Sequence, residues 1–307
     1  MFVEKKIIGN KSYYYLKTSE RKGNKVKSKT IAYLGKAPMS KKEIQDKIDA
    51  QNKLKLLLDE AQIEHVEELK KEFNKKLKSK DTKLIEDMFR DFKTHYIYNT
   101  NAIEGNTLTL EETNMLLNKN ITPEGKDLRE IYDHINEKET FDFIMHEMLE
   151  LSNENIIKLH KMLLNNIDKR IGSYRQHNVR VFGASFDTSP AEYVSIDMNL
   201  LLKWHKSNKD MHPLIAAAIF HERFERIHPF YDGNGRTGRM LSNLILIRKG
   251  YPPIIIENKK RKEYYEALSK AHEADINKQD YEDYKPIVTL FYEQLVNTYE
   301  RIFSKWG

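Results

Sequence analysis

The sequence predicts a mainly α-helical protein with one β-hairpin among its helices and a small β module at its N-terminus. From residue 84 onward, apolar residues recur at spacings of three and four, which is typical of helices that pack on one another. Alternating patterns typical of strands are confined to residues 11–35 and 174–194. At 307 residues, 39% of them hydrophobic, the chain is long enough for one or two domains with a buried core.

Residues 1–38 are predicted to form a basic β module. The segments KSYYYLKT and VKSKTIAYLG have strand character, and RKGNK between them supplies a Gly-Asn turn. Residues 1–40 hold ten Lys or Arg and two acids, a net charge of +8, whereas the whole chain has +6. Basic residues interleaved with tyrosines suit a nucleic-acid or acidic protein partner, and a basic strand edge also opposes aggregation. Nucleic-acid contact, partner recruitment and a structural role are all open for this module.

The next segment, residues 39–83, is predicted to be a charged helical linker or arm. Ser40 and Glu43 make a capping box at its start. Apolar residues then follow at helical spacing, namely Leu54, Leu57, Leu58, Ile63, Val66, Leu69 and Phe73. The many Lys and Glu residues favour a solvated spacer, or an arm through which two copies form a homodimer.

Residues 84–307 are predicted to form a helical core domain. The expected helices cover residues 84–98, 109–118, 126–151, 153–166, 195–206, 213–227, 236–249, 259–274 and 280–304. The hairpin at residues 174–194 rests on a short alternation of apolar and other residues, made by Val179, Arg180, Val181 and Phe182. Because a lone hairpin is only marginally stable, it is expected to pack on the helices.

The composition excludes several classes of protein. The chain has no cysteine, which rules out a disulfide framework and a thiol-based zinc site. No apolar run approaches the length of a membrane span, and the first ten residues lack the apolar core of a signal peptide. A cytoplasmic protein without membrane contact is therefore expected.

The twelve residues from His228 to Arg239, HPFYDGNGRTGR, carry the most chemical information in the chain. Gly233 and Gly235 flank Asn234, so the backbone can turn tightly and direct N–H groups at an anion. The expected helix that follows would add the positive end of its dipole. This loop is therefore a candidate anion site.

Four side chains of the loop suit a metal-bound polyphosphate. Arg236 and Arg239 are three apart, on one face of the first helical turn, where guanidiniums can bind phosphate oxygens. Asp232 is a hard oxygen ligand suited to Mg²⁺. His228 is the loop residue that titrates near neutrality, which makes it the natural general base. Because the base must be neutral, we expect activity to fall as the pH drops through its pKa, within about pH 5.5 to 8.

The loop resembles, over its full length, the signature of the Fic family: HPF, any residue, Asp or Glu, Gly-Asn, Gly or Lys, Arg, two residues, Arg. The resemblance covers roughly residues 84–300 and implies a helical bundle with a hairpin flap. Most members of the family transfer AMP from ATP to a Ser, Thr or Tyr hydroxyl of a target protein. A protein adenylyltransferase is therefore implied, with His228 as base, Asp232 as Mg²⁺ ligand and ATP phosphates bound by Gly233, Asn234, Gly235, Arg236 and Arg239.

A second motif, TNAIEG, resembles the inhibitory helix of the same family. Thr100 and Glu104 are four apart and share a helix face, and Gly105 is suited to ending the helix. The resemblance implies an inhibitory helix over residues 96–105, in which Glu104 pairs with Arg239 and takes the place of the γ-phosphate. The protein is thus expected to be autoinhibited by a helix that precedes the loop.

The resemblance also implies contacts for the nucleoside and the target. Tyr264 and Tyr265 lie where relatives carry a tyrosine pair near the base; Tyr265 is expected to stack on adenine, and ordinary packing is open for Tyr264. His272 stands where a relative has Asn at the nucleoside. In the family the hairpin is a flap that holds a target segment by strand addition, which would make the target-binding residues Val179, Arg180, Val181 and Phe182.

Other activities are compatible with the same residues. The site could remove AMP instead of adding it, with Glu104 positioning the attacking water. The loop alone does not separate AMP transfer from transfer of UMP or phosphocholine, whereas Gly235, where phosphorylating relatives carry Lys, argues against phosphate transfer. From a different class, a nucleic-acid-binding regulator with a slow catalytic core also fits.

Overall fold

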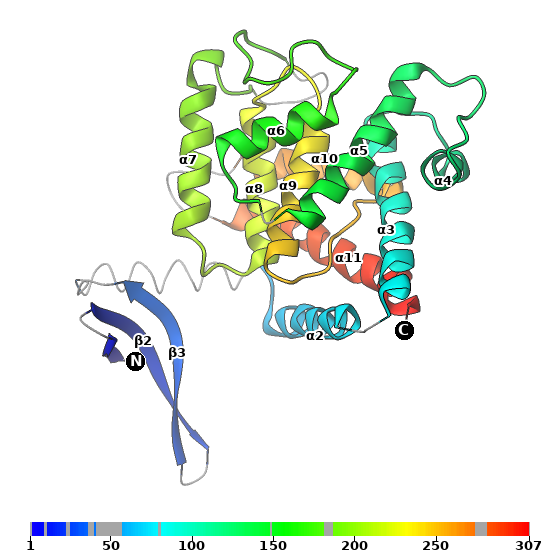
Figure 1. Ribbon diagram of the computed structural model, residues 1–307. Helices are drawn as coiled ribbons and strands as arrows, with labels where there is room; N and C mark the ends of the chain where they lie inside the picture. The colour runs from blue at the N-terminus through cyan, green and yellow to red at the C-terminus, as the bar shows by residue number, and fades with distance from the viewer. Residues whose placement is uncertain are drawn as a thin grey trace.

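The computed structural model describes residues 2–8, 11–22, 25–35, 40, 57–78, 81–147, 149–180, 187–273 and 281–306. Figure 1 shows a helical body and a separate small sheet beside it. The mainly α-helical fold with an N-terminal β module that the sequence predicts is therefore confirmed. No helix of the described ranges is long and apolar enough to cross a bilayer.

The basic N-terminal module is a three-stranded antiparallel sheet in the order β1-β2-β3. Its strands are β1 Phe2–Ile8, β2 Lys11–Lys22 and β3 Lys25–Gly35. The two strands expected between residues 11 and 35 are both present, and β1 adds a third that pairs Phe2 with Lys17. The expected Gly-Asn turn lies outside the described residues.

The described helices agree closely with the predicted positions. They are α2 Glu60–Leu77, α3 Thr82–Ile103, α4 Leu110–Lys119, α5 Leu128–His146, α6 Asn153–Leu163, α7 Val194–Ser207, α8 Pro213–Ile227, α9 Asn234–Arg248, α10 Arg261–Ala271 and α11 Lys285–Arg301. The prediction for α8 is correct at both ends. The predicted helix 126–151 is too long, because Glu147 is already extended.

Helices α8 and α9 form the centre of the helical body. Apart from Gly235, residues 234–246 of α9 are buried, as expected for a helix covered on all sides. Helix α9 contacts α3, α5 and α6, while α8 contacts α7 and α11. In Figure 1 the pair lies between α7 on one side and α3 and α5 on the other. The loop that joins α8 to α9 is therefore held by helices from several directions.

Helix α3 is one continuous element that spans both the expected core helix and the expected inhibitory helix. The Asp81 carboxylate caps its start by accepting the Leu84 N–H at 3.0 Å. The helix ends at Ile103, and Gly105 has φ +97°, as predicted for a glycine that ends a helix. Glu104 is therefore held at the end of a long, packed helix.

Helix α2 lies within the segment predicted to be a charged helical linker or arm, and one face of it is packed against the rest of the chain. Phe73 of α2 is buried, and its ring centroid lies 4.9 Å from that of Phe303 near the C-terminus. The apolar face of this helix is thus packed within the chain. The expected helix start at Ser40 cannot be compared, since residues 41–56 lie outside the described residues.

We expect Phe73→Ala to lower the free energy of unfolding by about 3–5 kcal/mol, because it opens a cavity in an aromatic cluster. Lys71→Ala, at an exposed position of the same helix, is the matched control and should change it by less than about 0.5 kcal/mol. Denaturant titration of both variants measures the difference. Equal stability of the two variants would show that α2 is a solvated arm after all.

Candidate active site

The loop between α8 and α9 begins and ends with left-handed backbone. His228 has φ +52° at the end of α8, and Gly233 has φ +73° before α9. A Cβ at Gly233 would collide with the side chain of Leu164, so both backbone and packing favour glycine here. Helix α9 starts earlier than predicted, and Asn234 and Gly235 are part of its first turn rather than of a separate anion-binding turn.

Asn234 supports the loop through its side chain. Its Nδ2 donates to the Phe230 carbonyl and its Oδ1 accepts the Phe230 N–H, both at 2.9 Å. The first helical bond of α9 runs from the Thr237 N–H to the Gly233 carbonyl at 3.0 Å. The N–H groups before Thr237 therefore have no helical acceptor, and they lie at the positive end of the helix dipole. This is where an anion can bind.

His228 is half-buried, and its backbone carbonyl accepts a hydrogen bond from Arg175 Nε at 2.8 Å. Burial lowers the pKa of its imidazole to about 4. The expectation of a pKa near neutrality is therefore wrong: the imidazole is neutral throughout the range of about pH 5.5 to 8. A neutral imidazole at this position can accept a proton without first losing one.

Asp232 is bound to α5 and to its own loop. Arg129 of α5 donates to one carboxylate oxygen at 2.5 Å, and the Gly233 N–H donates to the other at 2.6 Å. Burial alone would raise the pKa of Asp232, but Arg236, Gly233 and Arg129 bring it below its usual value. Within the described ranges no cluster of three or more metal-binding side chains exists. The ionised Asp232 carboxylate is a hard oxygen donor of the kind that Mg²⁺ prefers.

The two loop arginines have different partners. Arg236 pairs with Asp133 of α5, and both side chains are almost completely buried. Arg239 pairs with α3: its Nε donates to Thr100 Oγ1 at 2.8 Å, and a terminal nitrogen donates to Glu104 Oε1 at 2.6 Å. The predicted contact between Glu104 and Arg239 is thus confirmed, with Thr100 as a second partner.

The Glu104 carboxylate lies against the first turn of α9. A Cβ added to Gly235 would collide with Glu104 Oε1. The Glu104 side chain is 35% exposed, whereas that of Arg239 is 3% exposed. Burial alone would lower the pKa of Arg239, but Glu104 raises it above its usual value. Glu104 therefore occupies space next to the free N–H groups and neutralises the nearest guanidinium.

Two further acids lie near Arg239, and the pKa of each is raised above its usual value. Burial raises the pKa of Glu225 to about 8, and the negative charge of Glu104 acts in the same direction. Burial also raises the pKa of Glu137, to about 7, although the loop arginines oppose it. Glu104 is therefore the main ionised partner of Arg239, and its withdrawal would leave this guanidinium for an anionic ligand.

The tyrosine pair of α10 is divided between core and surface. Tyr264 is buried with its hydroxyl 2.6 Å from His221 Nε2, whereas Tyr265 is 41% exposed and can present a ring face. The Nδ1 of His272 lies 2.7 Å from Glu222 Oε1, and its side chain is 5% exposed. The His272 side chain is thus buried against Glu222, which does not fit the predicted contact with the nucleoside. The exposed position of Tyr265 fits a stacking role.

The segment expected to be the target-binding flap, residues 174–194, differs from the predicted hairpin. Val179 and Arg180, like the other described residues of the segment, are in no strand. Val181 and Phe182 lie outside the described residues. The alternating side chains predicted a regular strand, but the described residues 174–180 and 187–194 do not form one.

Four residues that the sequence analysis did not select shape this site. Arg175 is 1% exposed and fixes the backbone of His228. The other three lie four residues apart on α5. Arg129 contacts Asp232, Asp133 contacts Arg236, and Glu137 is the carboxyl whose raised pKa the loop arginines oppose. In the sequence these three residues form a row of charges on one helix face, a pattern that more often marks a solvated face.

Comparison with known proteins places this site in a family. The model of the Fic/DOC family matches residues 150–246. Protein adenylyltransferase fic-1 of Caenorhabditis elegans is 33% identical over 226 residues, which cover 71% of this chain and 44% of that protein. Protein adenylyltransferase Fic of Drosophila ananassae is 34% identical over 186 residues, which cover 59% of this chain and 37% of that protein. The chain thus spans less than half the length of these curated relatives.

Two solved structures are similar over most of the chain. A Fic domain containing signaling protein from Bacteroides thetaiotaomicron has a TM-score of 0.69 at 26% identity and covers 77% of this chain and 94% of its own. A fragment of Fic-1 from C. elegans has a TM-score of 0.67 at 28% identity and covers 87% of this chain and 78% of its own. The matched family region contains the whole loop from His228 to Arg239. The chain belongs to the Fic/DOC family.

Proposed function

We propose that the protein transfers AMP from ATP to a Ser, Thr or Tyr hydroxyl of a target protein. One observation carries the proposal: a single loop brings the neutral imidazole of His228, the ionised carboxylate of Asp232 and the N-terminus of α9 together. Nucleotidyl transfer needs a base for the hydroxyl, a place for metal-bound phosphates and positive charge along them. The names of the curated relatives support the same reaction.

The phosphates of ATP are proposed to bind along the start of α9. The backbone N–H groups of Asn234 and Gly235 would hold the α-phosphate, and Arg236 and Arg239 would neutralise the β- and γ-phosphates. Asp232 would hold Mg²⁺, which when bound supplies positive charge between the α- and β-phosphates. The exposed ring face of Tyr265 would stack on adenine.

His228 would act on the target hydroxyl. Its neutral imidazole accepts the hydroxyl proton while the oxygen forms a bond to the α-phosphorus of ATP. The bond from the α-phosphorus to the oxygen that bridges to the β-phosphorus breaks, and pyrophosphate leaves. The protein contributes position and charge stabilisation rather than a covalent intermediate.

Glu104 is proposed to inhibit this reaction in the resting protein. Its carboxylate occupies the partner position on Arg239 that a phosphate would take, and it repels an incoming anion. A second candidate function is the removal of AMP, with Glu104 positioning the attacking water. The 35% exposure of its side chain favours that candidate, because water can reach the carboxylate.

We expect Glu104→Gly to increase self-labelling from α-³²P-labelled ATP with Mg²⁺ by on the order of tenfold to a hundredfold, because it restores Arg239 to the phosphates. Glu124→Gly, at an exposed loop position, is the matched control and should label like the wild type. Adding His228→Ala to Glu104→Gly should abolish labelling. Label that persists without His228 would contradict its role as base, and no gain in Glu104→Gly would contradict inhibition.

The pKa of His228 gives a second test. Because burial lowers the pKa of His228 to about 4, its imidazole should show no titration between about pH 5.5 and 8. The transfer activity of the protein should therefore be lost only below about pH 5. NMR of the histidine ring signals, assigned with His228→Ala, measures this directly. A titration midpoint near about 6.5 would mean that the imidazole is solvated and that the described loop geometry is not the one in solution.

The basic sheet is proposed to contact nucleic acid. Lys5 and Lys6 lie 6.0 Å and 5.7 Å above the rings of Tyr14 and Tyr15, an arrangement of cations and aromatic faces suited to phosphates and bases. The full chain should bind RNA and DNA oligonucleotides, and this binding should weaken steeply between about 50 and 200 mM salt. Deleting residues 1–36 should abolish the binding and leave self-labelling of Glu104→Gly intact. Equal oligonucleotide binding with and without the sheet would refute the proposal.

A further inference from the structure

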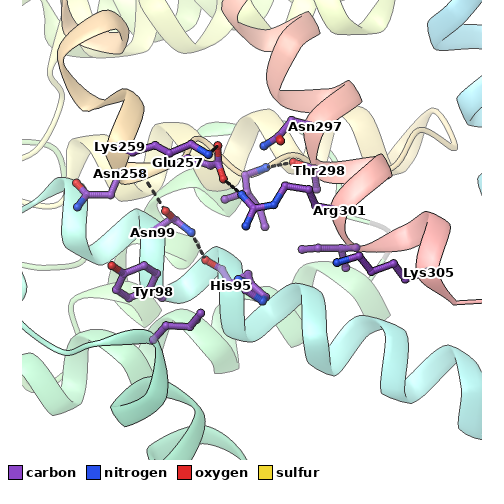
Figure 2. Close-up of a pocket in the computed structure, with 13 residues that line it drawn as sticks. His95, Tyr98, Asn99, Glu257, Asn258, Lys259, Asn297, Thr298, Arg301 and Lys305 are labelled. Atoms are coloured by element: carbon purple, nitrogen blue, oxygen red, sulfur yellow. Dashed lines mark hydrogen bonds and ion pairs between the residues drawn. The ribbon is translucent and has the colours of Figure 1, made fainter.

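A polar pocket of about 370 Å³ lies between α3, the segment before α10 and the C-terminal end of the chain (Figure 2). None of the loop residues from His228 to Arg239, all of which are described, lines it. Its two sides are joined where Asn99 Oδ1 accepts the Asn258 N–H at 2.8 Å. A space of this volume is suited to a small-molecule ligand.

Three cationic side chains and a single carboxylate line this pocket. Lys259 and Arg301 both pair with Glu257, Lys259 at 2.9 Å. Lys305 also lines the pocket, and the described part of the chain gives it no ion-pair partner. Figure 2 shows Arg301 and Lys305 on one wall, across from Tyr98. The pocket therefore has an excess of positive charge, which favours an anion.

The pKa of His95, on the α3 side of the pocket, depends on two of these cations. Its Nε2 lies 3.5 Å from Asp91. Burial lowers the pKa of His95, Asp91 opposes this, and the positive charges of Arg301 and Lys305 lower it further. A bound anion would offset those two charges and raise the pKa of His95.

Part of the remaining wall is apolar or aromatic. It consists of Tyr98, Leu110, Ile255 and Ile302. The Tyr98 ring can pack against a flat apolar group. A ligand that satisfies both parts of the pocket combines an anionic group with a planar ring.

We propose that this pocket binds a small phosphate-bearing molecule with a planar ring, of the nucleoside monophosphate class. Its phosphate lies between Arg301 and Lys305, where a guanidinium can donate two hydrogen bonds and the ammonium adds a point charge. Its ring lies against Tyr98. The site is separate from the ATP site proposed above and does not depend on it.

The test is an NMR titration of the His95 ring in the full chain, assigned with His95→Gln. AMP and inorganic phosphate are each added in phosphate-free buffer, with sodium chloride at equal ionic strength as reference. We expect saturable shifts and a higher His95 pKa with both, and tighter binding of AMP because of its ring. Replacing both cations, as Arg301→Gln with Lys305→Gln, should weaken AMP binding by about tenfold or more.

Lys285→Gln, which removes one positive charge from the other end of α11, is the matched control and should leave binding unchanged. Lys305→Gln alone, at an exposed position, provides a milder variant should the double one unfold. Shifts that follow ionic strength equally with chloride would overturn the proposal. So would AMP binding that is undiminished without Arg301 and Lys305, or binding of AMP no tighter than that of phosphate.

Discussion

The ion pair between Glu104 and Arg239 is the contact on which the charge balance of the active site depends. A guanidinium as buried as that of Arg239 needs an anionic partner, because an unpaired charge in the interior is strongly unfavourable. Glu104 provides that partner from the end of α3, with Thr100 one turn before it. A phosphate oxygen could satisfy the same group. In the proposed reaction Glu104 and a phosphate of the substrate would therefore compete for one positive charge.

The fold leaves Arg239 few other ionised partners besides Glu104. Helices α8 and α9 lie at the centre, and neighbouring helices bring their charges to the loop between them. Arg236 is already matched by Asp133, while burial keeps Glu225 largely protonated near neutral pH. Glu104 is thus the main negative charge that interacts with the Arg239 guanidinium. Since Glu104 is partly exposed at the end of its helix, it can move away without disrupting the core.

The sequence allowed the fold class and the position of α8 to be predicted, because each depends on local spacing. The Glu104–Arg239 contact was predicted only because the resemblance to the Fic family implies it. The sequence did not reveal the role of Asp133, since charges four residues apart on a helix usually mark a solvated face. The packing of Phe73 depends on Phe303, far along the chain, so the Lys- and Glu-rich context suggested a solvated arm instead. The pKa of His228 depends on burial by neighbouring helices, which no local pattern reports.

The most direct test of competition between Glu104 and the phosphates is calorimetric. We would measure the affinities of Mg²⁺-ATP and AMP for the wild type and for Glu104→Gly. We expect ATP to bind at least about tenfold more tightly to the variant, because its terminal phosphates gain Arg239, while the affinity for AMP stays nearly unchanged. An equal gain for both nucleotides, or no gain for ATP, would show that Glu104 does not occupy the place of a phosphate.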